Sequence, residues 1–169
     1  MNNILKFGSV LSCVFFLAAC ETPYEEANTY DASKDGSAYA DADAGYGATG
    51  PGSEADFTNN VGDRVYYATD SSVVTAEGRA TLQRQAAWLN KYSNINVVVE
   101  GHADERGTRE YNLALGERRA NAAKNVLIAA GVSPSRITTI TYGKERPAVL
   151  GSNAQAWAQN RRAVTVLAR

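Results

Sequence analysis

The residue types best suited to chemistry gather in residues 100–108, which read Glu-Gly-His-Ala-Asp-Glu-Arg-Gly-Thr. This segment follows an apolar run and precedes a helical pattern, a place where α/β folds commonly carry binding groups. Beyond it, Asn112, Leu115 and Arg119 are spaced by three and then four residues, so they share one helix face beside the loop. Asp104 and Arg119 are therefore expected to line one shallow site. Aspartate accepts hydrogen bonds from an ammonium group, and arginine donates two hydrogen bonds to a carboxylate. The pair therefore suits a zwitterionic ligand.

Other uses of these residues remain open. Asp104 and Arg119 can bridge each other as a surface ion pair, which contributes about 0–1 kcal/mol. His102 is the sole histidine, and a zinc site needs further His or Cys ligands, so a hydrogen-bonded structural role is expected for it. A hydrolase needs a nucleophile with a base, a metal-bound water or a carboxylate pair. Asp104 with Glu105 supplies a weak acid/base pair at best, so we expect no enzyme.

The elements that position these residues follow from hydrophobic periodicity and turn residues. The valines at 97–99 form a continuous apolar run, which is typical of a strand covered on both faces. Gly131 followed by Pro134 ends the helix that Thr108 can begin. Strands are expected at residues 64–67, 96–100, 137–142 and 163–167, and helices at about 75–92, 108–130 and 155–159. The order β-α-β-α-β-α-β predicts an α/β sandwich with helices packed on a mixed four-stranded sheet.

The N-terminus carries an export pattern. Lys6 and a short apolar stretch precede Leu-Ala-Ala-Cys at residues 17–20, and the stretch is too short to span a bilayer. The last four residues resemble the lipobox of bacterial lipoproteins, which implies removal of residues 1–19 and a covalent lipid (N-acyl and S-diacylglycerol) on Cys20. A plain signal peptide with an incidental cysteine is the alternative. Cys13 leaves with the signal, so no disulfide is expected.

Charge divides the remainder of the chain, although the formal net charge of its 169 residues is only −1. Residues 20–56 hold nine acidic residues and one lysine, whereas residues 64–169 hold fifteen basic and eight acidic residues. Small and polar residues without an apolar period predict a disordered acidic linker over residues 20–56. The basic domain at residues 57–169 favours an anionic partner. Export argues against nucleic acid.

Several motifs occur in an order that resembles the OmpA-like peptidoglycan-binding domains. The matching residues are 100–108, Tyr111, Asn112, Leu115, Arg119 and Ala120, then 142–147 (Tyr-Gly-Lys-Glu-Arg-Pro) and 160–162 (Asn-Arg-Arg). The resemblance covers about residues 64–167. With the lipobox and the linker, the chain is similar to the peptidoglycan-associated lipoproteins of the Tol–Pal system.

This resemblance implies noncovalent binding of the meso-diaminopimelate residue of uncrosslinked peptidoglycan stem peptides. Asp104 matches the position that takes the ammonium, and Arg119 the position that takes the carboxylate. Asn112, Leu115 and Gly101 match positions in or supporting the pocket. Arg119→Ala is accordingly expected to abolish binding and to leave the fold intact.

The first strand departs from the family pattern. Many members carry an aromatic–Asp pair there, where this chain has Tyr67 and Ala68, followed by Thr69 and Asp70. No binding role passes to Ala68, and Asp70 is the candidate substitute.

The resemblance also implies a cellular role: an outer-membrane lipoprotein that faces the periplasm, tethers the membrane to the cell wall and supports constriction at division. A periplasmic propeller partner such as TolB is implied by family alone, and no cofactor beyond the lipid is expected. The alternatives are a peptidoglycan hydrolase and a protein-docking lipoprotein without wall binding.

Overall fold

The computed structural model describes residues 50–168. The expected signal peptide, Cys20 and the linker up to residue 49 lie outside the described residues. In chain order the elements are α1 (Glu54–Asp56), a π-helical segment (Phe57–Val61), β1 (Arg64–Tyr66), α2 (Ala76–Lys91), β2 (Val97–His102), α3 (Arg109–Ala129), a 3-10 turn (Pro134–Arg136), β3 (Ile137–Gly143), α4 (Ala154–Asn160) and β4 (Arg162–Leu167). Each strand and helix expected from the sequence is present within a few residues of its expected bounds.

The four strands form one mixed sheet in the order β1-β4-β2-β3. β2 pairs in parallel with β3 and antiparallel with β4, and β4 pairs antiparallel with β1. The C-terminal ends of β1 and β2 therefore lie beside the N-terminal end of β4. The predicted mixed four-stranded α/β sandwich is confirmed.

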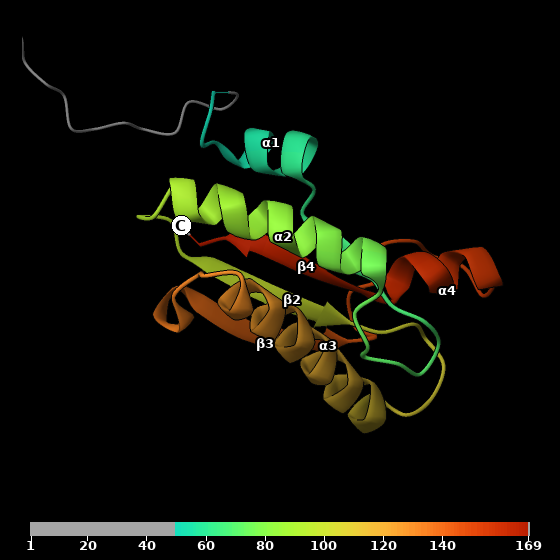
Figure 1. Ribbon diagram of the computed structural model, residues 1–169. Coiled ribbons are helices and arrows are strands. Elements are labelled where there is room, and N and C mark those ends of the chain that lie inside the picture. Colours follow the sequence, from blue (N-terminus) through green and yellow to red (C-terminus); the bar gives the residue numbers. More distant parts are fainter. Residues whose placement is uncertain (1–49, 169) are drawn as a thin grey trace, which may run out of the picture. The chain divides into compact units, whose positions relative to one another are not determined.

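Helices α2 and α3 cover one face of this sheet (Figure 1). Leu82 and Leu89 from α2 meet Ala123 and Leu127 from α3 in a single core, over inward-facing residues of the strands. Val97 and Val99 of β2 belong to that core, but Val98 between them is only half-buried. The expectation that both faces of β2 are covered is therefore wrong, because an apolar run alone does not distinguish one buried face from two.

The described fold begins before the expected domain boundary at Phe57. The Ser53 side chain accepts a hydrogen bond from the Asp56 amide and caps α1. Phe57 is buried against Trp88 of α2, with ring centroids 4.9 Å apart. Residues 53–56, assigned to the linker from their composition, are thus part of this N-terminal helical segment.

A close contact between two glycines sets the position of α3 on the sheet. A Cβ built on Gly101 of β2 would lie 1.8 Å from the backbone oxygen of Gly116 on α3. Only a residue without a side chain permits this approach. Thr108 caps α3 by accepting from the Tyr111 amide, as expected. Together these features fix the loop between β2 and α3.

Candidate functional site

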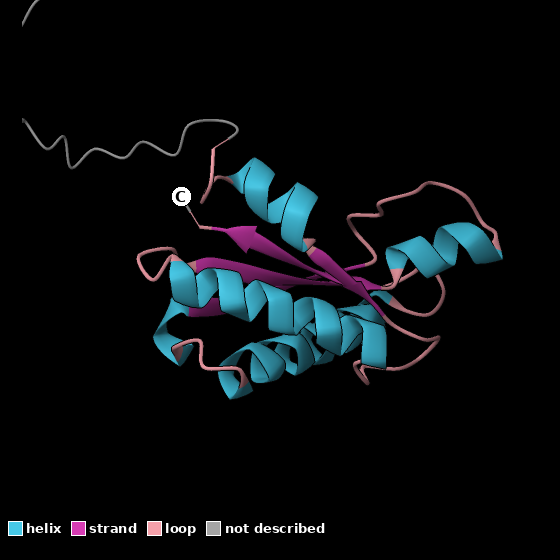
Figure 2. Ribbon diagram, turned by 45° about the horizontal axis from the view of Figure 1, so that its top comes forward, coloured by secondary structure: helices cyan, strands magenta, loops and turns pink. Residues whose placement is uncertain are grey.

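Three chain segments that are distant in sequence meet at one end of the sheet, where several loops also lie (Figure 2). Tyr66 pairs with Arg162 and Gly101 pairs with Ala163, so the segments after β1 and β2 and the segment before β4 meet where α3 begins. Residues distant in sequence are therefore brought into one site by strand pairing.

An open pocket of about 310 Å³ lies at this meeting point. It is lined by Thr69, Asp70, Asp104, Arg106, Gly107, Tyr111, Asn112, Leu115 and Arg119. Five of the residues singled out from the sequence are in this lining. Gly101 is not in this lining; it lies on β2 in close contact with Gly116 of α3.

Arg119 is fully buried and holds the surrounding loops through its guanidinium. Nε donates to the Ser71 carbonyl at 2.8 Å, Nη1 to the His102 carbonyl at 2.8 Å, and Nη2 to the Ala68 carbonyl at 3.2 Å. A guanidinium has five N–H donors, and these bonds use three of them. Burial lowers the pKa of Arg119 to about 10, and the side chain remains a cation at neutral pH.

Asp104 does not bridge Arg119 but is held by two other arginines. Its Oδ1 accepts from the backbone amide and the Nε of Arg106, at 3.1 and 3.0 Å. Its Oδ2 accepts from Nη2 of Arg106 at 2.7 Å and from Nη1 of Arg161 at 3.4 Å. Burial raises the pKa of Asp104, but hydrogen bonds and charge from Arg106 outweigh it and lower the pKa overall. The carboxylate is therefore ionised at neutral pH.

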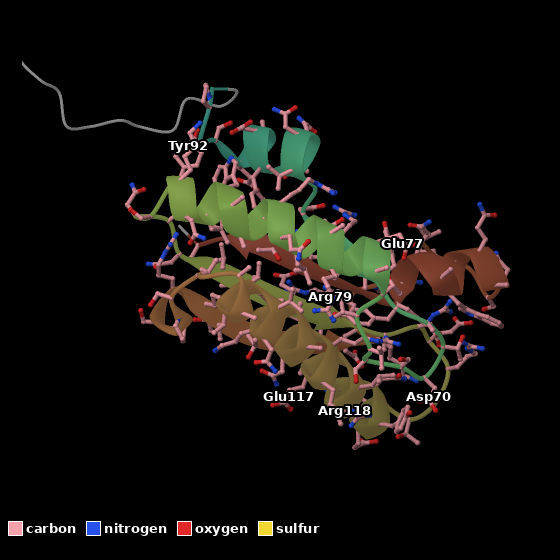
Figure 3. All side chains as sticks on the ribbon, viewed as in Figure 1. Asp70, Glu77, Arg79, Tyr92, Glu117 and Arg118 are labelled. Carbon is pink, nitrogen blue, oxygen red and sulfur yellow. The ribbon has the colours of Figure 1, made fainter. Side chains whose placement is uncertain are left out.

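Asp70 lies on the loop between β1 and α2, on the rim of the pocket (Figure 3). Its φ of 56° is in the left-handed region, which aspartate tolerates better than most residues. Ala68, at the position of the missing family aspartate, contributes only its carbonyl to Arg119. Asp70 thus shares the pocket lining with Asp104 and Arg119, and its role as the substitute for the family aspartate stays a prediction.

Asn112 and Leu115 shape the pocket from α3. The buried Asn112 donates from Nδ2 to the Arg106 carbonyl at 2.7 Å, which fixes the loop that carries Asp104. Leu115 is buried in the pocket wall. Their shared helix face, predicted from the spacing, is confirmed.

Sequence reasoning missed the residues that surround Asp104. Arg106 and Arg161 hold its carboxylate, and the Arg106 guanidinium lies over the ring of Trp157, 4.3 Å from the centroid. Trp157 in turn donates from Nε1 to Glu105 at 2.9 Å. Arg161 and Trp157 are more than fifty residues from Asp104 and Glu105, so spacing along the chain held no signal for them.

His102 is buried beneath the site, but without the hydrogen bonds expected for it. Neither ring nitrogen has a hydrogen-bond partner within residues 50–168. Nε2 lies 3.5 Å from Oε2 of Glu100, and the ring packs against Tyr142. Burial, followed by the positive charges of Arg162 and Arg146, lowers the pKa of His102 to about 4.

This depressed pKa predicts a pH-dependent stability. In the unfolded chain, histidine is protonated below about pH 6.5. In the folded protein, His102 stays neutral down to about pH 4. The free energy of unfolding should therefore fall by about 2 kcal/mol between pH 6.5 and 5, because a lowered histidine pKa favours the unfolded state in acid. Denaturant unfolding at several pH values measures the slope. His102→Phe should flatten it, since this is the only histidine in the chain; an unchanged slope in that variant would contradict the assignment.

The chemistry available at the pocket is recognition of opposite charges. A carboxylate and a guanidinium face one open space, with an apolar wall from Leu115. No group of metal-ligating side chains occurs within residues 50–168. In the same range, no helix has the length and apolarity needed to cross a membrane.

Comparison with known proteins agrees with the sequence motifs. A model of the OmpA family matches residues 66–161. The peptidoglycan-associated lipoprotein of Mesorhizobium japonicum is 59% identical over 123 residues, 73% of each chain. That of Pseudomonas aeruginosa is 41% identical over 165 residues, 95% of this chain and 96% of the other.

Solved structures show the same fold. The crystal structure of the peptidoglycan-associated lipoprotein from Burkholderia pseudomallei matches with a TM-score of 0.63 and 39% identity, over 66% of this chain and 96% of that one. The C-terminal domain of Helicobacter pylori MotB matches with a TM-score of 0.59 and 20% identity, over 63% and 84%, which shows a shared fold alone. The chain belongs to the OmpA family and, within it, to the peptidoglycan-associated lipoproteins.

Proposed function

We propose that this protein binds peptidoglycan noncovalently through the zwitterionic end of a diaminopimelate stem peptide. The ammonium would pair with Asp104 and the carboxylate with the guanidinium of Arg119. The observation that carries this proposal is the open pocket in which these opposite charges face one ligand-sized space. Asp70, on the rim, adds a second negative charge near the ammonium.

The site favours reversible binding over turnover. Its two lining carboxylates come with no histidine or cysteine in the pocket lining, and hydrogen bonds from Arg106 help hold the Asp104 pKa low, which suits an anion better than an acid/base catalyst. Affinity for one peptide should be modest, because a zwitterion is costly to desolvate. Many copies facing many wall peptides would give strong adhesion through avidity.

The cellular part of the proposal rests on family and on the N-terminal motif. A lipid on Cys20 would hold the protein in the outer membrane, facing the periplasm, while its domain holds the cell wall. As part of a Tol–Pal assembly, with a partner such as TolB, the protein would connect the outer membrane to the cell wall at the constricting division site. Cys20→Ser should release the protein into the soluble fraction, and membrane retention of that variant would contradict the anchor.

The chemical test compares two stem peptides by NMR titration of residues 20–169 carrying Cys20→Ser. L-alanyl-γ-D-glutamyl-meso-diaminopimelate offers an ammonium and a carboxylate on one carbon. The matched L-lysine peptide keeps the ammonium but lacks that carboxylate. Loss of a charge-assisted bidentate contact should weaken binding by about 2 kcal/mol, or roughly 30-fold. Equal affinities would exclude a role for Arg119 in recognising the carboxylate.

A further inference from the structure

Both oxygens of Asp104 are already saturated. A carboxylate offers about four acceptor positions, two on each oxygen. Oδ1 accepts from the amide and Nε of Arg106, and Oδ2 accepts from Nη2 of Arg106 and Nη1 of Arg161. An incoming ammonium therefore finds no free position and must replace one of these donors.

The two arginines differ in how firmly they are held. The Arg161 side chain is only 13% exposed, and its Nε also donates at 3.0 Å to the carbonyl of Tyr67, the residue that follows β1. The Arg106 side chain is 41% exposed and supplies the two shorter side-chain bonds to Asp104. Arg106 also donates from Nη2 to Thr69 Oγ1 at 3.5 Å. Its bonds to Asp104 are the shorter ones, but it is the more exposed of the two arginines and is therefore the one with room to move into solvent.

The surroundings of Arg106 give its side chain a second support. Its guanidinium lies 4.3 Å from the centroid of the Trp157 ring, and Trp157 is tied to Glu105 through Nε1. A cation over a tryptophan face is stabilised without a carboxylate partner. Arg106 can thus release Asp104 and remain at the rim of the pocket.

We infer that Arg106 is an exchangeable latch that competes with the ligand's ammonium for Asp104 and so sets the affinity of the site. This inference rests on the proposed stem-peptide function. When a binding site is free in only a fraction of molecules, the apparent affinity falls by that fraction. The latch keeps single bonds to the wall weak, and weak bonds let a tether exchange between sites while many copies hold together.

The test is an NMR titration of the diaminopimelate tripeptide into residues 20–169 carrying Cys20→Ser, with and without Arg106→Gln. Removing the competing side chain should tighten binding about three- to tenfold, the range of a partly exposed charged pair. Arg106→Met, which keeps a side chain over Trp157, should give a similar gain. The matched control is Arg109→Gln, the same charge change at an arginine that pairs with Glu145 outside the pocket; it should bind like the parent protein.

Two further readouts separate the latch from a general charge effect. The gain from Arg106→Gln should vanish in the Asp104→Asn background, and the Arg106 Nε–H signal should lose its protection when peptide binds the parent protein. Unchanged or weaker binding by Arg106→Gln, or a gain that survives Asp104→Asn, overturns the latch while leaving the proposed function in place. Absence of peptide binding in both the parent protein and Arg106→Gln overturns both.

Discussion

Arg119→Ala is expected to lower the free energy of unfolding by about 3–5 kcal/mol and to abolish ligand binding, because the side chain holds the surrounding loops together and is also the ligand contact that we propose. Its guanidinium donates to three backbone carbonyls, two of which lie in the loop between β1 and α2. Truncation removes a hydrogen-bond donor from each of these carbonyls and opens a cavity in a fully buried place. This revises the sequence-based expectation that the fold would stay intact.

The adjacent arginine provides a matched control for this variant. Arg118 is exposed on the outer side of α3, beside Glu117 (Figure 3). Arg118→Ala should change the free energy of unfolding by less than about 0.5 kcal/mol and leave binding unaltered. Urea unfolding of the two variants measures the difference. Equal stabilities would contradict the structural role of Arg119.

Asp104→Asn is expected to reduce affinity for the diaminopimelate tripeptide by at least about 2 kcal/mol, or roughly 30-fold, because the amide keeps the shape but loses the charge that pairs with the ammonium. The fold should persist, since the partly exposed Arg106 can turn to solvent. Glu117→Gln removes the same charge from the outer face of α3 and is the control.

Thermal unfolding of both variants shows whether any loss of binding comes from the site alone. If Asp104→Asn binds the tripeptide as tightly as Glu117→Gln, the ammonium pairs with another group, and Asp70 is the first alternative on the pocket rim.

Capping residues and hydrophobic periodicity along the chain were sufficient to predict most of the helices and strands of this fold. Thr108 and Gly131 mark the ends of α3 because capping and left-handed backbone geometry depend on the residue itself. The spacing of Asn112, Leu115 and Arg119 predicted their shared face, because helical periodicity fixes direction.

How deeply a side chain is buried, and which distant residues it contacts, could not be predicted in the same way. Arg119 reads as a polar surface residue, but the loop after β1, about fifty positions earlier, folds over it and accepts its hydrogen bonds. Arg161 reaches Asp104 across 57 positions because β4 pairs with β2. Such contacts depend on strand order, which no local spacing encodes.

Recognition of the cell wall through this pocket can be tested by co-sedimentation of residues 20–169 carrying Cys20→Ser with purified sacculi that contain diaminopimelate. We expect that this protein pellets with the sacculi and that soluble diaminopimelate tripeptide releases it. Asp104→Asn should stay in the supernatant, whereas Glu117→Gln should pellet. Equal pelleting of the two variants, or no pelleting of the parent protein, would contradict recognition of the wall through the Asp104–Arg119 pocket.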